Sequence, residues 1–377
     1  MLAAPGLLLS AASGALSPMI TRRFASDTLR PSIAMTDDLR GHPVVEIIRR
    51  RRREQSRPGE RDDGRRVALA IEGGGMRGVI SAGMTAALEH LGLRDSFDEI
   101  YGASAGAFNS AFLLAGQAAY LTALYMHGFG DPQFVSIRRA LRKGPALELD
   151  YVIDDVWTRQ RPLRFDAIIA SGISLHCTAT DADRAEIVDL TDLHSSEEIR
   201  CALRASARLP WLAGAPVEFR GRRLLDATLA EALPVQAAIA SATDILVLQT
   251  RPHGVHHAPL SPVVARLTDR YLRQINPGLV ILRRTRSQRY DKSSAMLSAR
   301  AADRSASPSV CVIRPPAGSL MIGQLEHRSA TLQLAASHGL RAAWMALEGE
   351  DPEIVATLRA YPRQPIDRPS LDVARVS

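Results

Sequence analysis

Short apolar runs alternate with longer amphipathic stretches through the middle of the chain. Residues 67–71, for example, are Val-Ala-Leu-Ala-Ile, a continuous apolar run ahead of a glycine turn. A run of this length beside turn residues is typical of a buried strand. By the same criterion we expect strands at 67–72, 98–103, 173–180, 186–190, 223–226, 244–250 and 310–314.

The segments between these runs carry alanine and larger apolar residues at helical spacing. They predict helices at 78–91, 105–116 and 196–208, a helical region extending to about residue 157, and arginine-rich helices between 259 and 359. Strands that alternate with helices favour an α/β fold, in which a mainly parallel sheet is flanked by helices on both faces.

The two ends of the chain differ from this central region. Residues 1–63 are predicted to be an N-terminal extension, largely disordered, whose apolar stretch at 1–16 is too short to span a membrane. Residues 64–255 form the expected catalytic core, and residues 256–360 a C-terminal, mainly helical part of the same domain. Residues 361–377 contain three prolines and are predicted to be a disordered tail.

The positive charge of the chain is carried almost wholly by arginine. The formal net charge is +7, and one continuous run consists of Arg49, Arg50, Arg51, Arg52 and Arg53. We expect this run to be solvated, and its functional interpretation is peripheral contact with anionic lipid headgroups. No recognisable nucleic-acid-binding module accompanies the charge, so a nucleic-acid partner is not expected.

The composition agrees with a globular protein that needs no bound group. Hydrophobic residues make up 46% of the chain, which is enough for a sizeable core. The three cysteines have neither the pattern of a disulfide framework nor the spacing of a metal site. We therefore expect no metal and no cofactor, and a cytoplasmic protein whose cysteines behave as small buried hydrophobic residues.

Two glycine motifs, one βα unit apart, carry the main functional signal. The first is Gly73-Gly74-Gly75-Met76-Arg77-Gly78, and the second is Gly102-Ala103-Ser104-Ala105-Gly106. Each follows an apolar run and precedes a helical pattern, which is the context of the G-x-S-x-G nucleophile elbow. This turn raises a serine hydroxyl to the C-terminal edge of the sheet. The pattern therefore predicts a serine acyl hydrolase with Ser104 as the nucleophile.

The first glycine motif is the predicted anion cradle of this site. The N–H groups of Gly74, Gly75 and Ala105, together with the N-terminus of the helix after Ser104, would stabilise a developing oxyanion. Arg77 would add a positive charge near the ester or near a lipid phosphate.

The same motif also fits the dinucleotide-binding fingerprint G-x-G-x-x-G. That fingerprint requires an acidic residue at the end of the second strand, where it binds a ribose hydroxyl. Here Asp98 and Glu99 stand at the start of the second strand, and its end carries Ser104. The sequence therefore disfavours dinucleotide binding, and the plain alternative is a structural glycine turn.

A third segment completes the pattern further along the chain. Residues 204–210 are Arg-Ala-Ser-Ala-Arg-Leu-Pro, and Asp226-Ala227-Thr228 follows a short apolar strand. Together the three segments resemble the patatin-like phospholipases, a family that includes bacterial acyl hydrolases. The family's motifs are G-G-G-x-R/K-G, G-x-S-x-G, and an A-S-x-x-x-P stretch leading to D-G-A or D-G-G. The resemblance extends over residues 67–250, with the motifs in the family's order.

The resemblance implies a patatin-like α/β fold and a lipid acyl hydrolase that forms an acyl-enzyme. Ser104 would be the nucleophile and Asp226 its base, a pair that works without histidine. Residues 73–78 would form the oxyanion loop, and Gly102 and Gly106 would shape the elbow. The implied substrates are acyl esters of phospholipids, lysophospholipids or glycerides.

One position departs from the family pattern, because Ala227 stands where the family has glycine. If the turn needed a positive φ there, alanine would strain it and displace Asp226. A weakly active enzyme, or a non-catalytic lipid-binding relative, therefore stays open as an alternative. A histidine-dependent acyl hydrolase or acyltransferase is a second alternative. It would draw on a loop after the strand at 244–250 that contains His253, His256 and His257.

Overall fold

The computed structural model describes most of the chain between residues 39 and 349. The described residues are 39, 41–127, 139, 145–160, 162–252, 254–255 and 261–349. The predictions for residues 1–38 and 350–377 lie outside this part of the chain.

One eight-stranded sheet forms the centre of the molecule. Its strands are β1 (Val67–Ile71), β2 (Glu99–Ala103), β3 (Ser174–Asp181), β4 (Glu186–Leu190), β5 (Val217–Phe219), β6 (Arg222–Leu225), β7 (Asp244–Leu248) and β8 (Ser309–Ile313). The order is β5-β6-β3-β2-β1-β7-β8, and β4 pairs with β3 outside this order.

The sheet is mainly parallel, as the sequence predicted. Strands β1, β2, β3, β7 and β8 pair in parallel, whereas β4, β5 and β6 pair antiparallel at one margin. Strands β3 and β4, like β5 and β6, are joined by short connections that leave no room for a crossover helix. Such connections permit antiparallel pairing alone.

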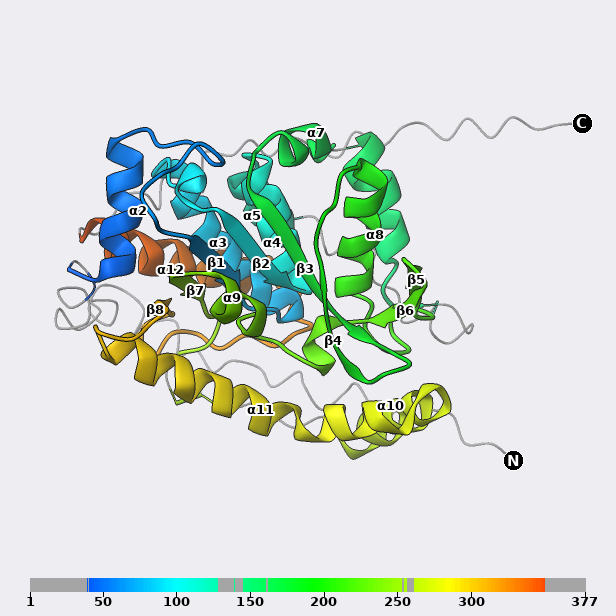
Figure 1. The fold of residues 1–377 in the computed structure, drawn as a ribbon. Coiled ribbons are helices and arrows are strands. Elements are labelled where there is room, and N and C mark those ends of the chain that lie inside the picture. Colours follow the sequence, from blue (N-terminus) through cyan, green and yellow to red (C-terminus); the bar gives the residue numbers. More distant parts are fainter. Residues whose placement is uncertain are drawn as a thin grey trace, which may run out of the picture.

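Helices cover both faces of the sheet (Figure 1). They are α2 (Pro43–Arg53), α3 (Gly78–His90), α4 (Ala105–Leu114), α5 (Ala118–His127), α7 (Phe165–Ile169), α8 (Ser196–Ser206), α9 (Gln236–Ser241), α10 (Pro262–Ile275), α11 (Pro277–Ala302) and α12 (Ser329–Glu348). Shorter helical pieces are the 3₁₀ turns η2 (Gly75–Arg77), η3 (Arg94–Ser96) and η5 (Ala227–Leu229), and the π-helical segment η4 (Tyr151–Gln160). None of the described helices is both long enough and apolar enough for a bilayer crossing.

Alternate residues of the central strands face opposite helix layers. Val67, Leu69 and Ile71 of β1 belong to a large core shared with helices α3, α4, α5 and α12. Ala68 and Ala70, between them, belong to a second core shared with α9 and α11. The two cores explain why β1 has the continuous apolar sequence of a strand buried on both faces.

Helix α2 is an ordered part of the N-terminal extension at residues 1–63, which the sequence predicted to be largely disordered. Val44, Val45 and Ile48 are fully buried in the large core. The Arg51 side chain is also fully buried, and its guanidinium contacts Asp63 and Asp98, each at 2.8 Å. The segment folds because apolar residues precede the arginines and distant carboxylates pair with Arg51.

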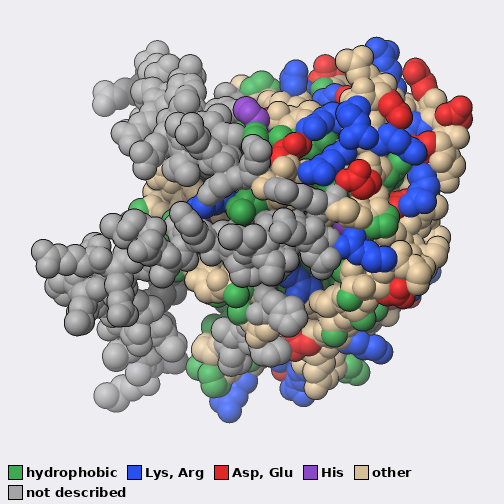
Figure 2. Space-filling model, turned by 90° about the vertical axis from the view of Figure 1, so that its left-hand side faces the viewer, with side chains coloured by type: hydrophobic (Ala, Val, Ile, Leu, Met, Phe, Trp, Pro, Cys, Tyr) green, Lys and Arg blue, Asp and Glu red, His purple; other side chains and the backbone are tan. Residues whose placement is uncertain are grey.

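The rest of the arginine run is only partly solvated. Arg49 donates to the carbonyl of Leu347, and Arg52 pairs with Glu348 at 2.7 Å, so both hold the end of α12. Figure 2 shows the face that carries α2, where basic and acidic side chains lie next to one another rather than in a patch of one sign. The expectation of a wholly solvated run is therefore wrong.

Arg51→Ala tests whether this buried ion pair holds the N-terminal segment. We expect a loss of unfolding free energy on the order of 3 kcal/mol, because two carboxylates lose their buried partner. The exposed neighbour Arg53 provides the matched control, since Arg53→Ala should change stability by no more than about 0.5 kcal/mol. Urea unfolding measures both, and equal losses in the two variants would contradict the account.

Candidate active site

Ser104 occupies the turn between β2 and α4. Its backbone angles are φ 53° and ψ −119°, a strained conformation for a residue with a side chain. The strain is maintained by close packing, because a Cβ at Gly106 would lie 2.2 Å from the carbonyl oxygen of Ile71. A Cβ at Gly102 would likewise lie 2.4 Å from the Cα of Ala107. These glycines let α4 approach the sheet closely, so Ser104 stands on a tight turn between a strand and a helix.

Ser104 and Asp226 lie in direct contact, although 122 residues separate them in the sequence. Ser104 Oγ donates to Asp226 Oδ2 at 2.7 Å. The exposed fraction is 5% for Ser104 and 0% for Asp226. Asp226 follows β6 directly, so the antiparallel margin of the sheet brings the carboxylate to the end of β2.

The second oxygen of Asp226 is held by Thr228. Oδ1 accepts hydrogen bonds from the backbone N–H of Thr228 at 2.8 Å and from its hydroxyl at 2.5 Å. Burial raises the pKa of Asp226 above its usual value, although these hydrogen bonds and the charge of Arg286 act in the opposite direction. The carboxylate is therefore a stronger base than an exposed aspartate.

Two further hydroxyl groups fix the position of the pair. The backbone N–H of Ser104 donates to Ser206 Oγ at 2.8 Å, and the Thr180 hydroxyl donates to the Asp226 carbonyl at 2.8 Å. Ser206 and Thr228 lie within segments that carry the sequence resemblance, but no role was predicted for them. Thr180 has no sequence signal beyond its strand, because only the β3–β6 pairing brings it to Asp226.

The glycine loop at 73–78 lies beside the elbow. The space next to the Cα of Gly73 is taken by the Ala103 carbonyl oxygen, and the space next to Gly78 by the Ala105 side chain. Gly75 has φ +58°, a conformation that glycine adopts without strain. The close approach of loop and elbow agrees with the predicted cradle.

Some backbone N–H groups of this loop are hydrogen-bonded and others are not. The N–H of Gly73 donates to the Ala232 carbonyl, and that of Met76 donates to the Gln324 carbonyl. Within the described part of the chain, the N–H groups of Gly74, Gly75 and Ala105 have no hydrogen-bond acceptor. These are the three donors that the sequence predicted for an oxyanion.

Arg77 points into the protein rather than into solvent. It is 4% exposed, and its Nε donates to the Thr250 hydroxyl at 2.8 Å. Its Nη2 lies 3.3 Å from Glu72, a fully buried carboxylate that also accepts from the Thr250 N–H. Arg77 thus anchors the glycine loop through a buried ion pair. These contacts do not support the prediction that Arg77 places a positive charge near the ester.

Ala227 does not strain the turn that carries Asp226. The residue opens the 3₁₀ turn η5 and is absent from the described non-glycine residues with positive φ. The turn therefore does not use the conformation for which glycine would be needed. The concern that alanine displaces Asp226 is not supported by the geometry.

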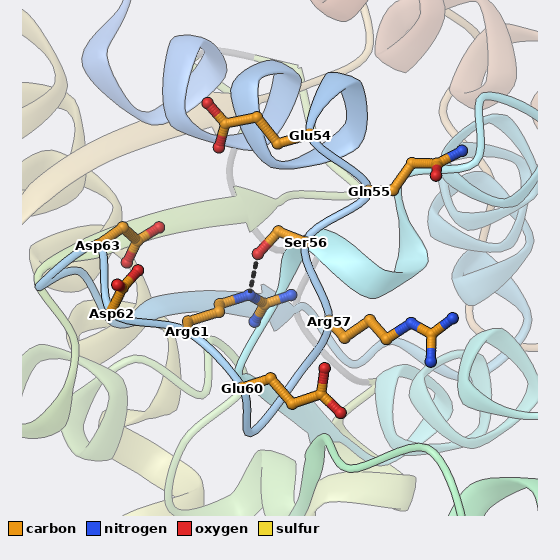
Figure 3. A pocket seen from close by; sticks show the side chains of 8 residues that line it. All are labelled: Glu54, Gln55, Ser56, Arg57, Glu60, Arg61, Asp62 and Asp63. Carbon is orange, nitrogen blue, oxygen red and sulfur yellow. Dashed lines mark hydrogen bonds between the residues drawn. The ribbon is translucent and has the colours of Figure 1, made fainter.

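The other candidate features lie outside the described residues or away from this centre. The histidines of the alternative interpretation, His253, His256 and His257, lie outside the described residues. A polar pocket is lined by residues 54–57 and 60–63, which precede β1 and so lie at the opposite edge of the sheet from Ser104 (Figure 3). Among the described residues no group of His, Cys, Asp and Glu side chains is arranged to hold a metal ion.

Comparison with known sequences points to one family. Residues 69–239 match the family model described as patatin-like phospholipase. The chain is 29% identical over 199 residues to YjjU of Escherichia coli K12, a protein described as uncharacterized. The match covers 52% of this chain and 54% of YjjU, so the chain spans about half the length of this curated relative.

Solved structures show weaker overall similarity. VipD from Legionella pneumophila has a TM-score of 0.35 and 12% identity, over 76% of this chain and 67% of VipD. The complex of full-length SpcU with full-length ExoU, from the type III secretion system of Pseudomonas aeruginosa, gives a TM-score of 0.23. This match has 12% identity and covers 81% of this chain and 74% of the matched chain. Scores at this level carry no conclusion about function.

The geometry of Ala227 leads to a specific expectation for Ala227→Gly. Turnover of a soluble ester should stay unchanged, because alanine imposes no strain. Stability should fall by about 0.4–1 kcal/mol, since glycine increases the conformational freedom of the unfolded chain. Activity and Tm measured on one preparation check this. Higher activity in the glycine variant would show that alanine does weaken the site.

Proposed function

We propose that the protein is a lipid acyl hydrolase using Ser104 and Asp226 as a catalytic dyad, on the premise that residues 69–239 match the patatin-like phospholipase family model. The observation that carries the proposal is the 2.7 Å hydrogen bond from Ser104 Oγ to a fully buried carboxylate. A general base must lie within hydrogen-bond reach of the proton that it removes, and this bond meets that requirement.

In the proposed first step Ser104 Oγ attacks the acyl carbonyl carbon and its proton passes to Asp226 Oδ2. The carbonyl oxygen becomes an oxyanion, which the unpaired N–H groups of Gly74, Gly75 and Ala105 stabilise. Collapse of this intermediate breaks the ester bond and leaves the acyl group on Ser104. The departing alcohol takes the proton from Asp226.

In the second step water attacks the acyl-enzyme. Asp226 removes a proton from the water, the oxyanion forms again in the same cradle, and the fatty acid leaves as Ser104 regains its proton. The raised pKa of Asp226 suits both roles, because a less acidic carboxyl group accepts a proton more readily and still donates it to a leaving alkoxide.

Phospholipids, lysophospholipids and glycerides remain the proposed substrates. The arginine run gives little support to peripheral contact with a lipid surface, because only Arg50 and Arg53 of its five arginines are exposed.

A cytoplasmic location remains a prediction. The three cysteines are unpaired, which is compatible with a reducing compartment.

Variants of the two proposed catalytic residues test the dyad. Ser104→Ala should abolish hydrolysis of p-nitrophenyl butyrate, and Asp226→Asn should lower it by roughly 10²–10⁴-fold, as expected for a lost general base. Circular dichroism checks that both variants are folded. Replacement of His253, His256 and His257 together by glutamine is the control and should have a much smaller effect. The reverse ranking would transfer the assignment to a histidine-dependent enzyme.

The pH profile tests the ionisation of Asp226. The base must be ionised, so kcat/KM should fall on the acid side at a pH above the usual titration range of aspartate, because burial raises the pKa. Thr228→Val removes a hydrogen bond that favours the ionised form, so the acid limb should move to still higher pH. A limb that stays in place would show that Asp226 does not control it.

A further inference from the structure

One face of helix α11 lies against the catalytic pair. Arg289 donates to the carbonyls of Leu229 and Ala230, in and just after the turn that follows Asp226. Tyr290 donates to Glu72, which follows β1, at 3.2 Å. Arg286 precedes these residues by three and four positions, so it lies on the same face of the helix. Helix α11 runs along the lower edge of the molecule in Figure 1.

In the described part of the chain, Arg286 differs from the other arginines of this helix because two of its three guanidinium nitrogens have no hydrogen-bond partner. Its Nε and Nη2 atoms are buried, and neither has an acceptor in the described part of the chain. Arg283 and Arg284, which come just before it, both pair with Asp269. A buried guanidinium with unused donors is unfavourable, and a bound anion would satisfy it.

Charged groups of both signs act on Arg286. The charges of Arg77 and Arg251 act on it in the same region, and the carboxylates that act on it are Asp226 and Glu72. Burial lowers the pKa of Arg286 to about 10, so the side chain stays charged at neutral pH.

The unused donors have a defined geometry. Nε and Nη2 form one edge of the planar Arg286 guanidinium. Such an edge can donate two parallel hydrogen bonds to the oxygens of a phosphate. Arg286 shares a helix face with Arg289 and Tyr290, so it lies on the side of α11 that packs against the turn after Asp226 and against Glu72.

We propose that Arg286 binds a phosphate oxygen of the substrate next to the catalytic pair, and that it makes the enzyme select acyl esters that carry a phosphate over neutral esters. The proposal rests on the proposed function, since it assigns a substrate class to the same site. Arg286 acts here as a specificity residue, because its donors contact the part of the substrate that does not react.

Two substrates with the same acyl chains measure this selectivity. Dihexanoylphosphatidylcholine carries a phosphate and dihexanoylglycerol does not, so the ratio of their kcat/KM values isolates the contribution of the phosphate. Arg286→Gln should lower this ratio by roughly tenfold or more, the loss expected for hydrogen bonds to a charged group. Arg284→Gln, which removes an exposed arginine from the same helix, is the matched control and should keep the wild-type ratio.

Inorganic phosphate provides a second test, and its Tm readout needs no turnover. Phosphate should raise the Tm of the wild-type protein above that in chloride at equal ionic strength, because it binds the folded state. It should also compete with dihexanoylphosphatidylcholine, whose phosphate would use the same guanidinium. Both effects should disappear in Arg286→Gln. Because the Tm readout is independent of catalysis, it remains informative even if Ser104→Ala shows that the proposed function is wrong.

Three results would overturn the proposal. A ratio that is unchanged in Arg286→Gln would show that Arg286 affects catalysis only through Asp226 or through folding. The absence of any phosphate-dependent rise in Tm in the wild-type protein would show that the guanidinium edge binds no phosphate, even if the variant fails to fold. Phosphate binding without preference for the phosphate ester would assign the site to free phosphate.

Discussion

The hydrogen bond between Ser104 Oγ and Asp226 Oδ2 joins two parts of the sheet that are built differently. Ser104 belongs to the parallel region, where the close approach of α4 to β1 holds it in a strained turn. Asp226 belongs to the antiparallel margin, where β6 pairs with β3. The site therefore depends on the relative position of these two regions, and Ser206 and Thr180 bond across the same junction.

Burial raises the pKa of Asp226 and so makes it a stronger base. Burial of a carboxylate also costs free energy of folding. A buried carboxylate must be compensated by hydrogen bonds or by nearby positive charge. Thr228 supplies hydrogen bonds to one oxygen, Ser104 occupies the other, and Arg286 contributes charge without direct contact. We propose that the Arg286 guanidinium, which acts on Asp226 from a distance, keeps its own donors available for a phosphate of the substrate.

The sequence predicted those features that local pattern determines, and missed those that depend on distant partners. Short apolar runs located the parallel strands, and the turn motifs located Ser104 and the glycine loop. The order of helix α2 was missed because Arg51 is stabilised by Asp98, which lies beyond β1 in the chain. Arg286 was missed for a similar reason, since one arginine in an arginine-rich helix has no local signal and only the packing of α11 brings it to Asp226.

Reaction with a fluorophosphonate, followed by mass mapping of the labelled peptide, tests the central claim most directly. The probe forms a covalent adduct only with a serine whose hydroxyl is activated and whose oxyanion cradle is formed. We expect a single adduct on Ser104 in the wild-type protein, formed much more slowly in Asp226→Asn. An unlabelled protein, an adduct on another residue, or labelling at an unchanged rate in Asp226→Asn would contradict the assignment of the dyad.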